Sequence, residues 1–423
     1  MPDLTRDSQQ ADVLRMSSQA RSHLLDEILP FWIPNSIDRT FGGYFTCYDN
    51  RGQFVSDAKY TWSQGRFIAV CSMLAQAARD GSLPLDADEL ISDAIRGAEF
   101  LYKYAIRPDF TTHYVLERSG EPAGQQTPSV YADCFAAMGF ARVAQVSEDP
   151  RWYKLAEKIL HAATETSRLP EIPTAPYQLP RNVRPYGVSM ILLNVELDMA
   201  AARAALGMER QDDALKRAVE DVWSFARSDG LYNEVLSEEL DPASLLKRHR
   251  TPGHSLEGLW MMALALEEGA TIEAQIVEQA VALCELGWDD QFGGILRYTD
   301  AEGGPPHGSL LGIPYEDLVR RTWATKLWWV HSEATWTTAL LAHRSGDQRL
   351  IQWRNRIWDY TRATFPARGE GKEWIQIRDR RGHPLDEVVA LPLKDPYHLI
   401  RNLLQVIELS KPQLQSDPPP STG

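Results

Sequence analysis

The sequence contains few cysteines and no cysteine motif that binds metal or carries out redox chemistry. Only four cysteines occur among 423 residues, and no two of them form a Cys-x-x-Cys pair, which argues against zinc knuckles and thioredoxin-like sites. Three of the four lie in apolar helical segments and are predicted to be small core residues. Free buried thiols are typical of a reducing compartment, so a cytoplasmic location is expected.

The sequence also lacks basic runs and long apolar runs. Its formal net charge is -14 at pH 7, and an acidic protein without a Lys/Arg-rich stretch repels phosphate backbones. No apolar run reaches the about 18 residues that a membrane span needs, and the N-terminus has no apolar segment like that of a signal peptide. We therefore expect neither a nucleic-acid partner nor a membrane.

Several common catalytic signatures are absent. The sequence has no G-x-S-x-G, H-E-x-x-H or G-x-x-x-x-G-K-[ST] motif, and no G-x-G-x-x-G that opens a helix after a strand. This argues against serine hydrolases of the α/β type, zincins, P-loop proteins and dinucleotide-binding enzymes. No metal and no cofactor are predicted. Paired carboxylates for glycoside hydrolysis stay open, because their spacing in sequence does not report their spacing in space.

Helical periodicity dominates what is present. Apolar residues recur at three- and four-residue spacing in about a dozen segments, and several, such as 131–147 and 188–206, are apolar on nearly all sides. Such segments are typical of inner helices that are buried by neighbours. An even number near twelve favours an all-α fold in which the helices close into an (α/α)6 barrel, and an open solenoid is the alternative. We expect one domain over 1–423, with 412–423 as a flexible tail.

Short polar segments between the helices repeat one pattern. Residues 38–55 and 289–305 each contain Asp, then Phe-Gly-Gly, an alternating apolar stretch, and Asp with a turn Gly. Residues 109–122 and 373–387 are looser versions. Each pattern predicts a short β-hairpin, and its recurrence indicates an internal repeat. Hairpins at one end of the barrel would form the walls of a pocket.

Two histidines lie at Pro-flanked openings of apolar helices. His254 follows Thr-Pro-Gly, and Glu257 lies one helical turn further along on the same face. His398 follows Asp-Pro in the same way. Glu257 could simply stabilise the helix N-terminus, or the two histidines could meet at one mouth of the barrel. Because imidazole titrates near neutral pH, the second arrangement suits proton transfer.

Three further side chains are unusual for the apolar helices in which they occur. Arg66 opens such a helix and needs an anionic partner, either a core glutamate or an enediolate oxygen of a substrate. Glu333 is costly to bury unless it is paired or used. His331, in the same helix as Glu333, is predicted to be a core histidine.

Six segments together resemble a known family. FWIPNSIDRTFGGYFTCYDNRGQ, KYTWSQGR, TPGHSLEGLW, KLWWVHSEA, EWIQIRDRRGHPL and DPYHLIRNLL resemble, in that order, the signature segments of the N-acylglucosamine 2-epimerase superfamily. That superfamily also includes cellobiose 2-epimerases and aldose–ketose isomerases acting on mannose-type sugars. The resemblance runs from about residue 20 to about residue 410 and implies an (α/α)6 barrel.

The resemblance also implies roles for individual residues. His254 and His398 would be the acid/base pair of an isomerase, and Arg66 would hold the sugar oxygens near C1 and C2. Glu257 and Glu333 would bind hydroxyls or support the histidines. The full set of expected substrate-binding residues is Arg66, Glu257, Glu333, Trp374 and Trp62, with the two tryptophans lining the pocket.

The implied reaction is the 2-epimerisation of N-acyl-D-glucosamine and N-acyl-D-mannosamine through an enediolate-like intermediate. The isomerases and cellobiose epimerases carry a further histidine near position 190, and residues 184–199 contain none, which favours the N-acylglucosamine branch. That branch is often activated by ATP, but the sequence has no phosphate-binding loop.

Four further functions stay open: interconversion of D-mannose and D-fructose, 2-epimerisation of another mono- or disaccharide, a glycoside hydrolase or lyase, and a non-catalytic helical-repeat binding protein. The expected partner is a small-molecule sugar, and a homodimer is expected by analogy alone.

Overall fold

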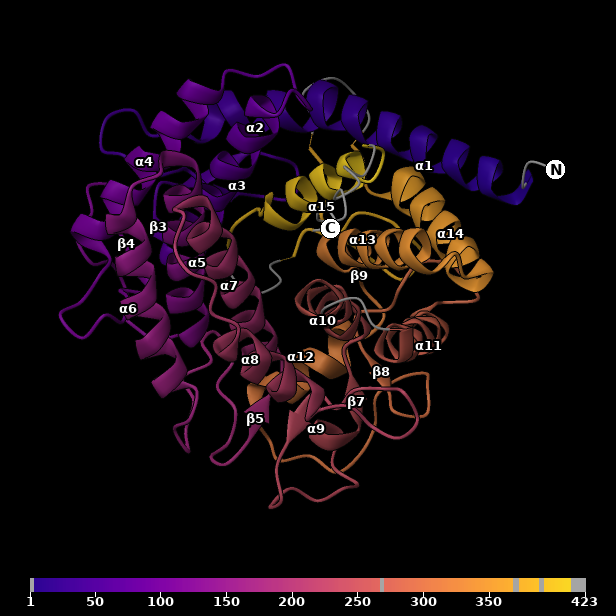
Figure 1. The fold of residues 1–423 in the computed structure, drawn as a ribbon. Coiled ribbons are helices and arrows are strands. Elements are labelled where there is room, and N and C mark those ends of the chain that lie inside the picture. The colour runs from indigo at the N-terminus through magenta and orange to yellow at the C-terminus, as the bar shows by residue number, and fades with distance from the viewer. Residues whose placement is uncertain (1–3, 267–269, 368–372, 388–391, 412–423) are drawn as a thin grey trace, which may run out of the picture.

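Six inner helices close into a ring in the computed structural model, which describes residues 4–266, 270–367, 373–387 and 392–411. The inner helices are α3 (Thr61–Arg79), α5 (Val130–Ser147), α7 (Tyr186–Ala205), α10 (Pro252–Ala265), α13 (Trp328–Ser345) and α15 (Tyr397–Glu408). Each packs on the next in this order, and α15 packs back on α3 (Figure 1). The closure confirms the predicted all-α (α/α)6 barrel over the open solenoid. The predicted tail at 412–423 lies outside the described residues.

Among the described residues, six outer helices surround this ring. The outer helices are α1 (Leu4–His23), α4 (Ala87–Tyr104), α6 (Pro150–Thr166), α8 (Asp213–Trp223), α11 (Ala270–Gly287) and α14 (Gln348–Thr364). Four of them, α4, α6, α8 and α11, pack on two inner helices each, whereas α1 packs on α15 and α14 on α13. A π-helical turn, η1 (Leu24–Ile28), joins α1 to α2 (Leu29–Ser36), and two short helices, α9 (Leu245–Arg248) and α12 (Pro314–Thr322), lie in the connections. The inner α5 is buried along nearly its whole length, whereas α4 and α6 bury one face, as the apolar periodicity predicts.

In the part of the chain that the structure describes, ten short strands form two-stranded antiparallel sheets. β1 (Cys47–Tyr48) pairs with β2 (Phe54–Ser56), which is the hairpin predicted at 38–55. The other sheets join distant segments: β3 (Lys59–Tyr60) with β4 (Val115–Leu116), β5 (Arg184–Pro185) with β6 (Val235–Leu236), β7 (His249–Arg250) with β8 (Thr299–Asp300), and β9 (Lys326–Leu327) with β10 (Ile377–Arg378).

This pairing corrects the prediction that 289–305 closes on itself as a hairpin, because its strand β8 pairs with β7 from an earlier repeat. The odd-numbered strands β3, β5, β7 and β9 each run directly into, or stop one residue before, an inner helix. Pairing with such a strand gives the backbone N–H and C=O groups of both segments hydrogen-bond partners and connects neighbouring repeats. It also gathers the N-terminal ends of the inner helices at the strand-bearing end of the barrel.

A buried ion pair fixes the first Phe-Gly-Gly loop to the strand before α3. Lys59 Nζ donates to Asp38 Oδ2 at 3.0 Å and to the carbonyl oxygen of Gly42 at 2.6 Å, and Arg118 Nε donates to Asp38 Oδ2 at 2.9 Å. Burial alone raises the pKa of Asp38, but the hydrogen bonds from Arg118 and Lys59 hold it well below its ordinary value. Asp38 is therefore ionised, and its charge is needed to keep Lys59 buried.

The second Phe-Gly-Gly loop repeats the arrangement. Lys326 Nζ lies 3.2 Å from Asp289 Oδ2 and 3.1 Å from the carbonyl oxygen of Gly294, while Arg380 Nε donates to the same carboxylate at 2.8 Å. The last glycine of each loop adopts a positive φ, 71° at Gly43 and 77° at Gly294, which glycine alone adopts without steric cost. The matching contacts confirm the internal repeat in the sequence.

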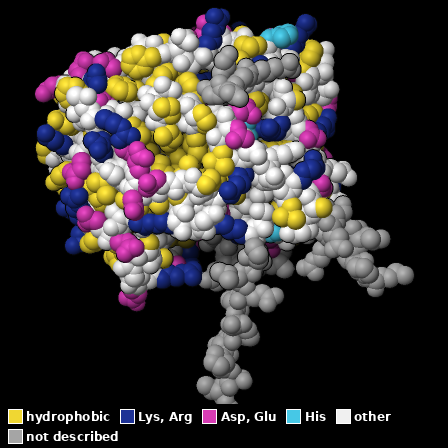
Figure 2. Space-filling view, turned by 90° about the horizontal axis from the view of Figure 1, so that it is seen from above, with side chains coloured by type: hydrophobic (Ala, Val, Ile, Leu, Met, Phe, Trp, Pro, Cys, Tyr) yellow, Lys and Arg dark blue, Asp and Glu magenta, His cyan; other side chains and the backbone are white. Residues whose placement is uncertain are grey.

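The surface carries both signs of charge. Figure 2 shows acidic and basic side chains interspersed over one face, around hydrophobic side chains near its middle. This face has no continuous basic patch of the kind that follows a phosphate backbone. Within the described ranges, no helix combines the length and apolar character needed to span a membrane.

Asp38→Asn should lower the free energy of unfolding by about 3–5 kcal/mol, because it leaves the buried Lys59 without a carboxylate. Chemical denaturation at neutral pH measures the change. Glu99→Gln is the matched control: it breaks the exposed Arg151–Glu99 pair at 2.7 Å and should cost less than about 1 kcal/mol. Equal losses in the two variants would contradict a structural role for the buried pair.

The pKa of Asp38 is depressed in the folded state. The contribution of this carboxylate to the free energy of unfolding should therefore be present above the unfolded-state pKa and be lost as the pH falls through the lower folded-state value.

Candidate active site

A cavity of about 510 Å³ opens at the strand-bearing end of the barrel and is lined by all six inner helices. This volume is typical of sites for small molecules. Its wall is largely aromatic, with a small number of charged groups among the rings. The aromatic side chains include Trp62, Tyr131, Phe135, Tyr177, Tyr298, Trp328, Trp329 and Tyr397.

His254 lines this cavity from the first turn of α10. Its Nδ1 lies 2.8 Å from Oε1 of Glu234, a buried carboxylate in the residue before β6, so Nε2 is the nitrogen left for a ligand. Burial lowers the pKa of His254, but the Glu234 charge and hydrogen bond outweigh it and the pKa is raised. Gly253 allows α10 to pack closely on α13, since a Cβ at this position would lie only 2.8 Å from a methyl carbon of Val330 in α13.

His398 is the second residue of α15 and has its own carboxylate. Its Nδ1 lies 2.6 Å from Oε1 of Glu333, a fully buried residue of α13. Glu333 also accepts hydrogen bonds from Asn402 Nδ2 at 2.7 Å, from Trp260 Nε1 at 2.8 Å and from Arg401. Burial alone raises the pKa of Glu333, but the charges of Arg401 and His398 lower it to about 2. Glu333 is thus a permanent anion behind the imidazole.

Glu257 lies beside His398 and does not pair with His254. Its Oε1 is 3.7 Å from His398 Nδ1 and 3.2 Å from Arg401 Nη2, and the residue lines the cavity. Of the two histidines, Glu257 therefore contacts His398, which fits its expected role in supporting a histidine, and Glu234 orients His254. Burial and the negative charge of Glu333 raise the pKa of Glu257.

The side chains of Glu257, Glu333 and His398 have ligand atoms within 4.8 Å of one another, as metal ligands do. A guanidinium nitrogen of Arg401 contacts both carboxylates at this point. The chain therefore supplies a positive charge of its own between these two acidic groups.

Both imidazole rings contact the same indole. The centroid of Trp329 lies 5.2 Å from that of His254 and 5.8 Å from that of His398. The structure therefore brings the two histidines that the sequence singles out to one cavity, where both contact Trp329. Trp329 itself was not among the predicted site residues.

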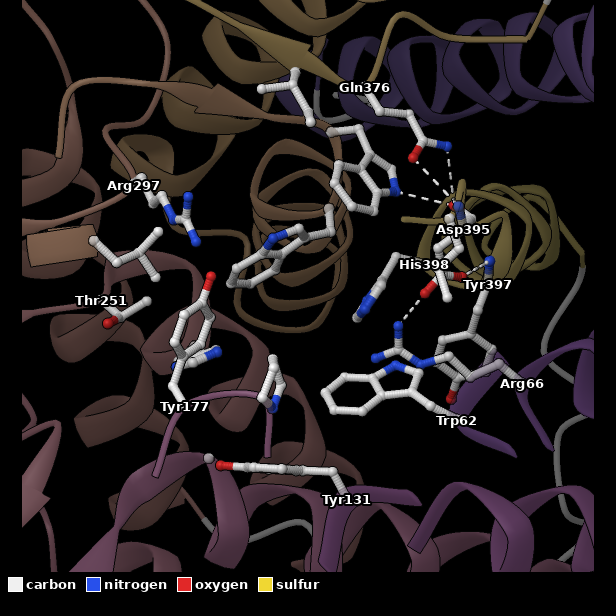
Figure 3. Close-up of a pocket in the computed structure, with 18 of the residues that line it drawn as sticks. Trp62, Arg66, Tyr131, Tyr177, Thr251, Arg297, Gln376, Asp395, Tyr397 and His398 are labelled. Atoms are coloured by element: carbon white, nitrogen blue, oxygen red, sulfur yellow. Dashed lines mark hydrogen bonds and ion pairs between the residues drawn. The ribbon is translucent and has the colours of Figure 1, made fainter. Parts of the chain in front are cut away.

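Arg66 lies beside His398 in the cavity wall (Figure 3). It forms an ion pair with the buried Asp395, and its guanidinium carbon lies 3.9 Å from the ring centroid of Phe135 and 5.2 Å from that of Trp62. The anionic partner in the protein is thus an aspartate, where the sequence suggested a glutamate. Trp62 lines the cavity, as expected.

Two predicted substrate-binding residues lie outside the cavity wall. Trp374 is buried in the core, where its Nε1 donates to His23 Nε2 at 2.6 Å and its ring stacks on Phe365. The prediction that Trp374 lines the pocket is therefore wrong, and Trp328 and Trp329 take that position. Glu333 sits behind His398, so of its two expected roles only the support of a histidine fits its position.

His331 is a core histidine, as predicted. Its Nε2 accepts a hydrogen bond from the backbone N–H of Ile295 at 2.9 Å, and its Nδ1 lies 2.8 Å from the carbonyl oxygen of Leu327. Burial lowers its pKa to about 3. The ring is therefore neutral and fixes the second Phe-Gly-Gly segment to α13.

Some site residues that the sequence analysis did not predict had a detectable signal in the sequence, and others had none. Arg401 and Asn402 follow His398 by three and four residues, which places them on the same helix face, and both contact Glu333. Glu234 lies 20 residues before His254 with strands and a short helix between them. Its pairing follows from the tertiary fold alone.

Comparison with known proteins agrees with this architecture. A family model described as N-acylglucosamine 2-epimerase matches residues 43–401. The chain is 29% identical to the N-acylglucosamine 2-epimerase of Bos taurus over 415 residues, which cover 94% of this chain and 92% of the relative. Among solved structures, a cellobiose 2-epimerase from Spirochaeta thermophila matches with a TM-score of 0.74 and 16% identity, covering 97% of this chain and 99% of the other. A D-mannose isomerase matches with a TM-score of 0.68 and 16% identity, covering 96% and 99%.

Glu234→Gln should lower the pKa of His254, because it removes the carboxylate that raises it. The imidazole titration can be followed by NMR, with His254→Asn used to assign the signal. Glu238→Gln is the control, since Glu238 is exposed and does not line the cavity. An unchanged pKa in Glu234→Gln, or the same decrease in the control, would contradict the pairing of His254 with Glu234.

Proposed function

The chain belongs to the N-acylglucosamine 2-epimerase family, and we propose that this sugar isomerase interconverts N-acyl-D-glucosamine and N-acyl-D-mannosamine by proton transfer at C2. One observation carries the proposal. Two imidazoles, each hydrogen-bonded through Nδ1 to a buried carboxylate, line one cavity and contact the same indole, that of Trp329. Two such groups can act as base and acid in one reaction.

The reaction begins with the open-chain sugar, its C1 carbonyl oxygen near Arg66. One imidazole removes the C2 proton, and the electron pair of the broken C–H bond forms the C1–C2 double bond and places negative charge on the C1 oxygen. Arg66 stabilises this charge as it develops. The other imidazolium then donates its proton to C2 from the opposite face, which restores the carbonyl group and inverts C2. In the reverse direction the two histidines exchange roles.

The carboxylates behind the histidines act through them. Glu234 and Glu333 hold Nδ1 of their partners, so that Nε2 faces the sugar, and they stabilise the imidazolium that forms during transfer. They are positioning residues, because neither has to touch the sugar. Glu257, with its raised pKa and its place in the cavity wall, is suited to hydrogen-bond a sugar hydroxyl.

The interconversion of D-mannose and D-fructose is the second candidate, since it needs the same enediolate and differs in delivering the proton to C1. The cavity wall contributed by α7 consists of Gly187, Met190, Ile191 and Asn194, none of which titrates near neutral pH. No additional acid is therefore available from α7 for C1, which favours the epimerase. A 2-acetamido sugar also cannot readily form a ketose. A 2-epimerase of a disaccharide would use the same pair of histidines.

A glycoside hydrolase and a non-catalytic scaffold fit the cavity less well. Glycoside hydrolysis needs two carboxylic groups free to act on a glycosidic bond, whereas Glu234, Glu257 and Asp395 are engaged with His254, Arg401 and Arg66. A binding scaffold has no need for these groups to converge.

A homodimer and a cytoplasmic location stay predictions, and light scattering would test the first.

Incubation with N-acetylmannosamine, D-mannose and cellobiose in separate reactions tests the substrate class. We expect N-acetylglucosamine to form from N-acetylmannosamine. Formation of fructose from mannose with the acetamido sugar untouched would assign the isomerase reaction instead, and turnover of cellobiose alone would assign the disaccharide reaction. Each incubation is repeated with ATP, so that a need for a nucleotide activator is separated from a lack of activity.

His254→Asn and His398→Asn should each lower kcat by about 10²- to 10⁴-fold, the usual contribution of a general acid or base. The melting temperature and circular dichroism spectrum should stay close to those of the wild type. His383→Asn is the control, because this side chain is 71% exposed, and its kcat should not change. Near wild-type rates in both test variants would refute the assignment of the acid/base pair.

A further inference from the structure

A second arginine lines the cavity on the side away from the proposed C1 site. Arg297 lies in the segment before β8 and is only 6% exposed. In Figure 3 its guanidinium points into the cavity on the same side of the view as Thr251 and Tyr177, across from Arg66, Asp395 and His398. The two arginines thus lie at opposite ends of one cavity.

Arg297 differs from the other buried arginines in its partners. Its guanidinium hydrogen-bonds the side chain of Tyr298, and its central carbon lies 5.0 Å from the ring centroid of that residue. Within the described ranges the side chain forms no ion pair with a carboxylate and no hydrogen bond to a backbone carbonyl oxygen. Arg250 and Arg378 also lack a paired carboxylate, yet Arg250 Nη1 donates to the carbonyl oxygen of Lys247 at 2.8 Å and Arg378 Nη1 to that of Gly382 at 2.9 Å. Because the guanidinium is always protonated, Arg297 places in the wall a positive charge that has no paired carboxylate.

The other cationic side chains in the cavity wall each contact a carboxylate. The paired groups are Arg66 with Asp395, His254 with Glu234, Lys394 with Glu373, and the acidic groups around His398 with Arg401. Asp49, Asp386 and Glu387 also line the cavity, and none of them pairs with Arg297. Asp49 is half-buried and accepts hydrogen bonds from the backbone N–H groups of Arg51 and Gln53, while Asp386 and Glu387 are exposed to water. Among the described residues, Arg297 is therefore the buried cationic side chain of the cavity wall that has no carboxylate paired with it.

Thr251 supplies a second unused donor on this side. Its side chain is 2% exposed and lines the cavity, and its hydroxyl has no hydrogen-bond partner in the part of the chain that the structure describes. A buried hydroxyl without a partner is unfavourable. A ligand that offers acceptor oxygens to both groups would satisfy the hydroxyl and neutralise the guanidinium.

We propose that Arg297 and Thr251 bind an anionic group, a carboxylate, phosphate or sulfonate, carried by the sugar at the end remote from C1. The guanidinium fork matches the paired oxygens of such groups. The assignment rests on the proposed function, because that function places C1 at Arg66 and C2 between the imidazoles, which leaves the rest of the sugar to extend toward Arg297. The preferred substrate is therefore an acidic sugar.

Calorimetric titration of the full-length protein with inorganic phosphate tests the subsite without any turnover. We expect Arg297→Met to weaken phosphate binding by about 10- to 100-fold and the isosteric Thr251→Val to weaken it less. Arg321→Met is the control, since Arg321 is exposed and does not line the cavity, and its affinity for phosphate should equal that of the wild type. Absence of phosphate binding, or equal affinity in Arg297→Met, would overturn the subsite even if the chain proves to be an epimerase.

A kinetic comparison decides whether the anion belongs to the sugar. The ratio of kcat/KM for N-acetylmannosamine 6-phosphate to that for N-acetylmannosamine should exceed one in the wild type and fall about 10- to 100-fold in Arg297→Met, with Arg297→Lys between them. If phosphate binds but this ratio is the same in wild type and Arg297→Met, the subsite takes a separate anion and the assignment to the substrate is wrong. If neither sugar reacts while phosphate binds through Arg297, the proposed epimerase reaction fails and the anion subsite stands.

Discussion

The carboxylate of Glu333 lies at the centre of the barrel with no access to water, and a charge in such a place is stable only when donors surround it. Arg401, Asn402, Trp260 and His398 supply those donors from α10 and α15. The same contacts fix the ring of His398 and draw Glu257 toward Arg401. One buried anion thereby sets the positions of three inner helices and the orientation of one of the two imidazoles.

The rest of the site follows from how the ring closes. Short strands run into α3, α7, α10 and α13, and the first turn of α15 lines the same cavity as the first turns of these helices, at one end of the barrel. Arg66, His254 and His398 lie in or near those turns, far apart in sequence and adjacent in space. Buried Lys–Asp pairs, Lys59 with Asp38 and Lys326 with Asp289, attach the Phe-Gly-Gly loops to two of these strands. The ion pairs that stabilise the loops and the residues proposed for catalysis therefore lie at the same end of the barrel.

Much of this could be predicted from the sequence, and the failures have physical reasons. Helical periodicity and the even number of helices predict the barrel, because both depend on local spacing. Pro-flanked helix openings identify His254 and His398, and a polar side chain in an apolar helix identifies Glu333.

Glu234, Asp395 and Arg297 were missed, since their roles arise from contacts between distant segments. Trp374 was misplaced because an aromatic residue in a loop fits a core as well as a pocket, and the strand pairing of 289–305 was wrong because a distant strand competes with the local one.

The most direct test of two-base proton transfer is the isotopic composition of the product formed in D2O. With N-acetylmannosamine as substrate, proton NMR at low conversion should show one deuterium at C2 of each N-acetylglucosamine molecule, while the remaining substrate keeps its C2 proton. This follows because one imidazole takes the substrate proton and the other delivers a solvent deuteron. N-acetylglucosamine that retains the original hydrogen at C2 would contradict the account, since a single group would then have moved that hydrogen between the two faces.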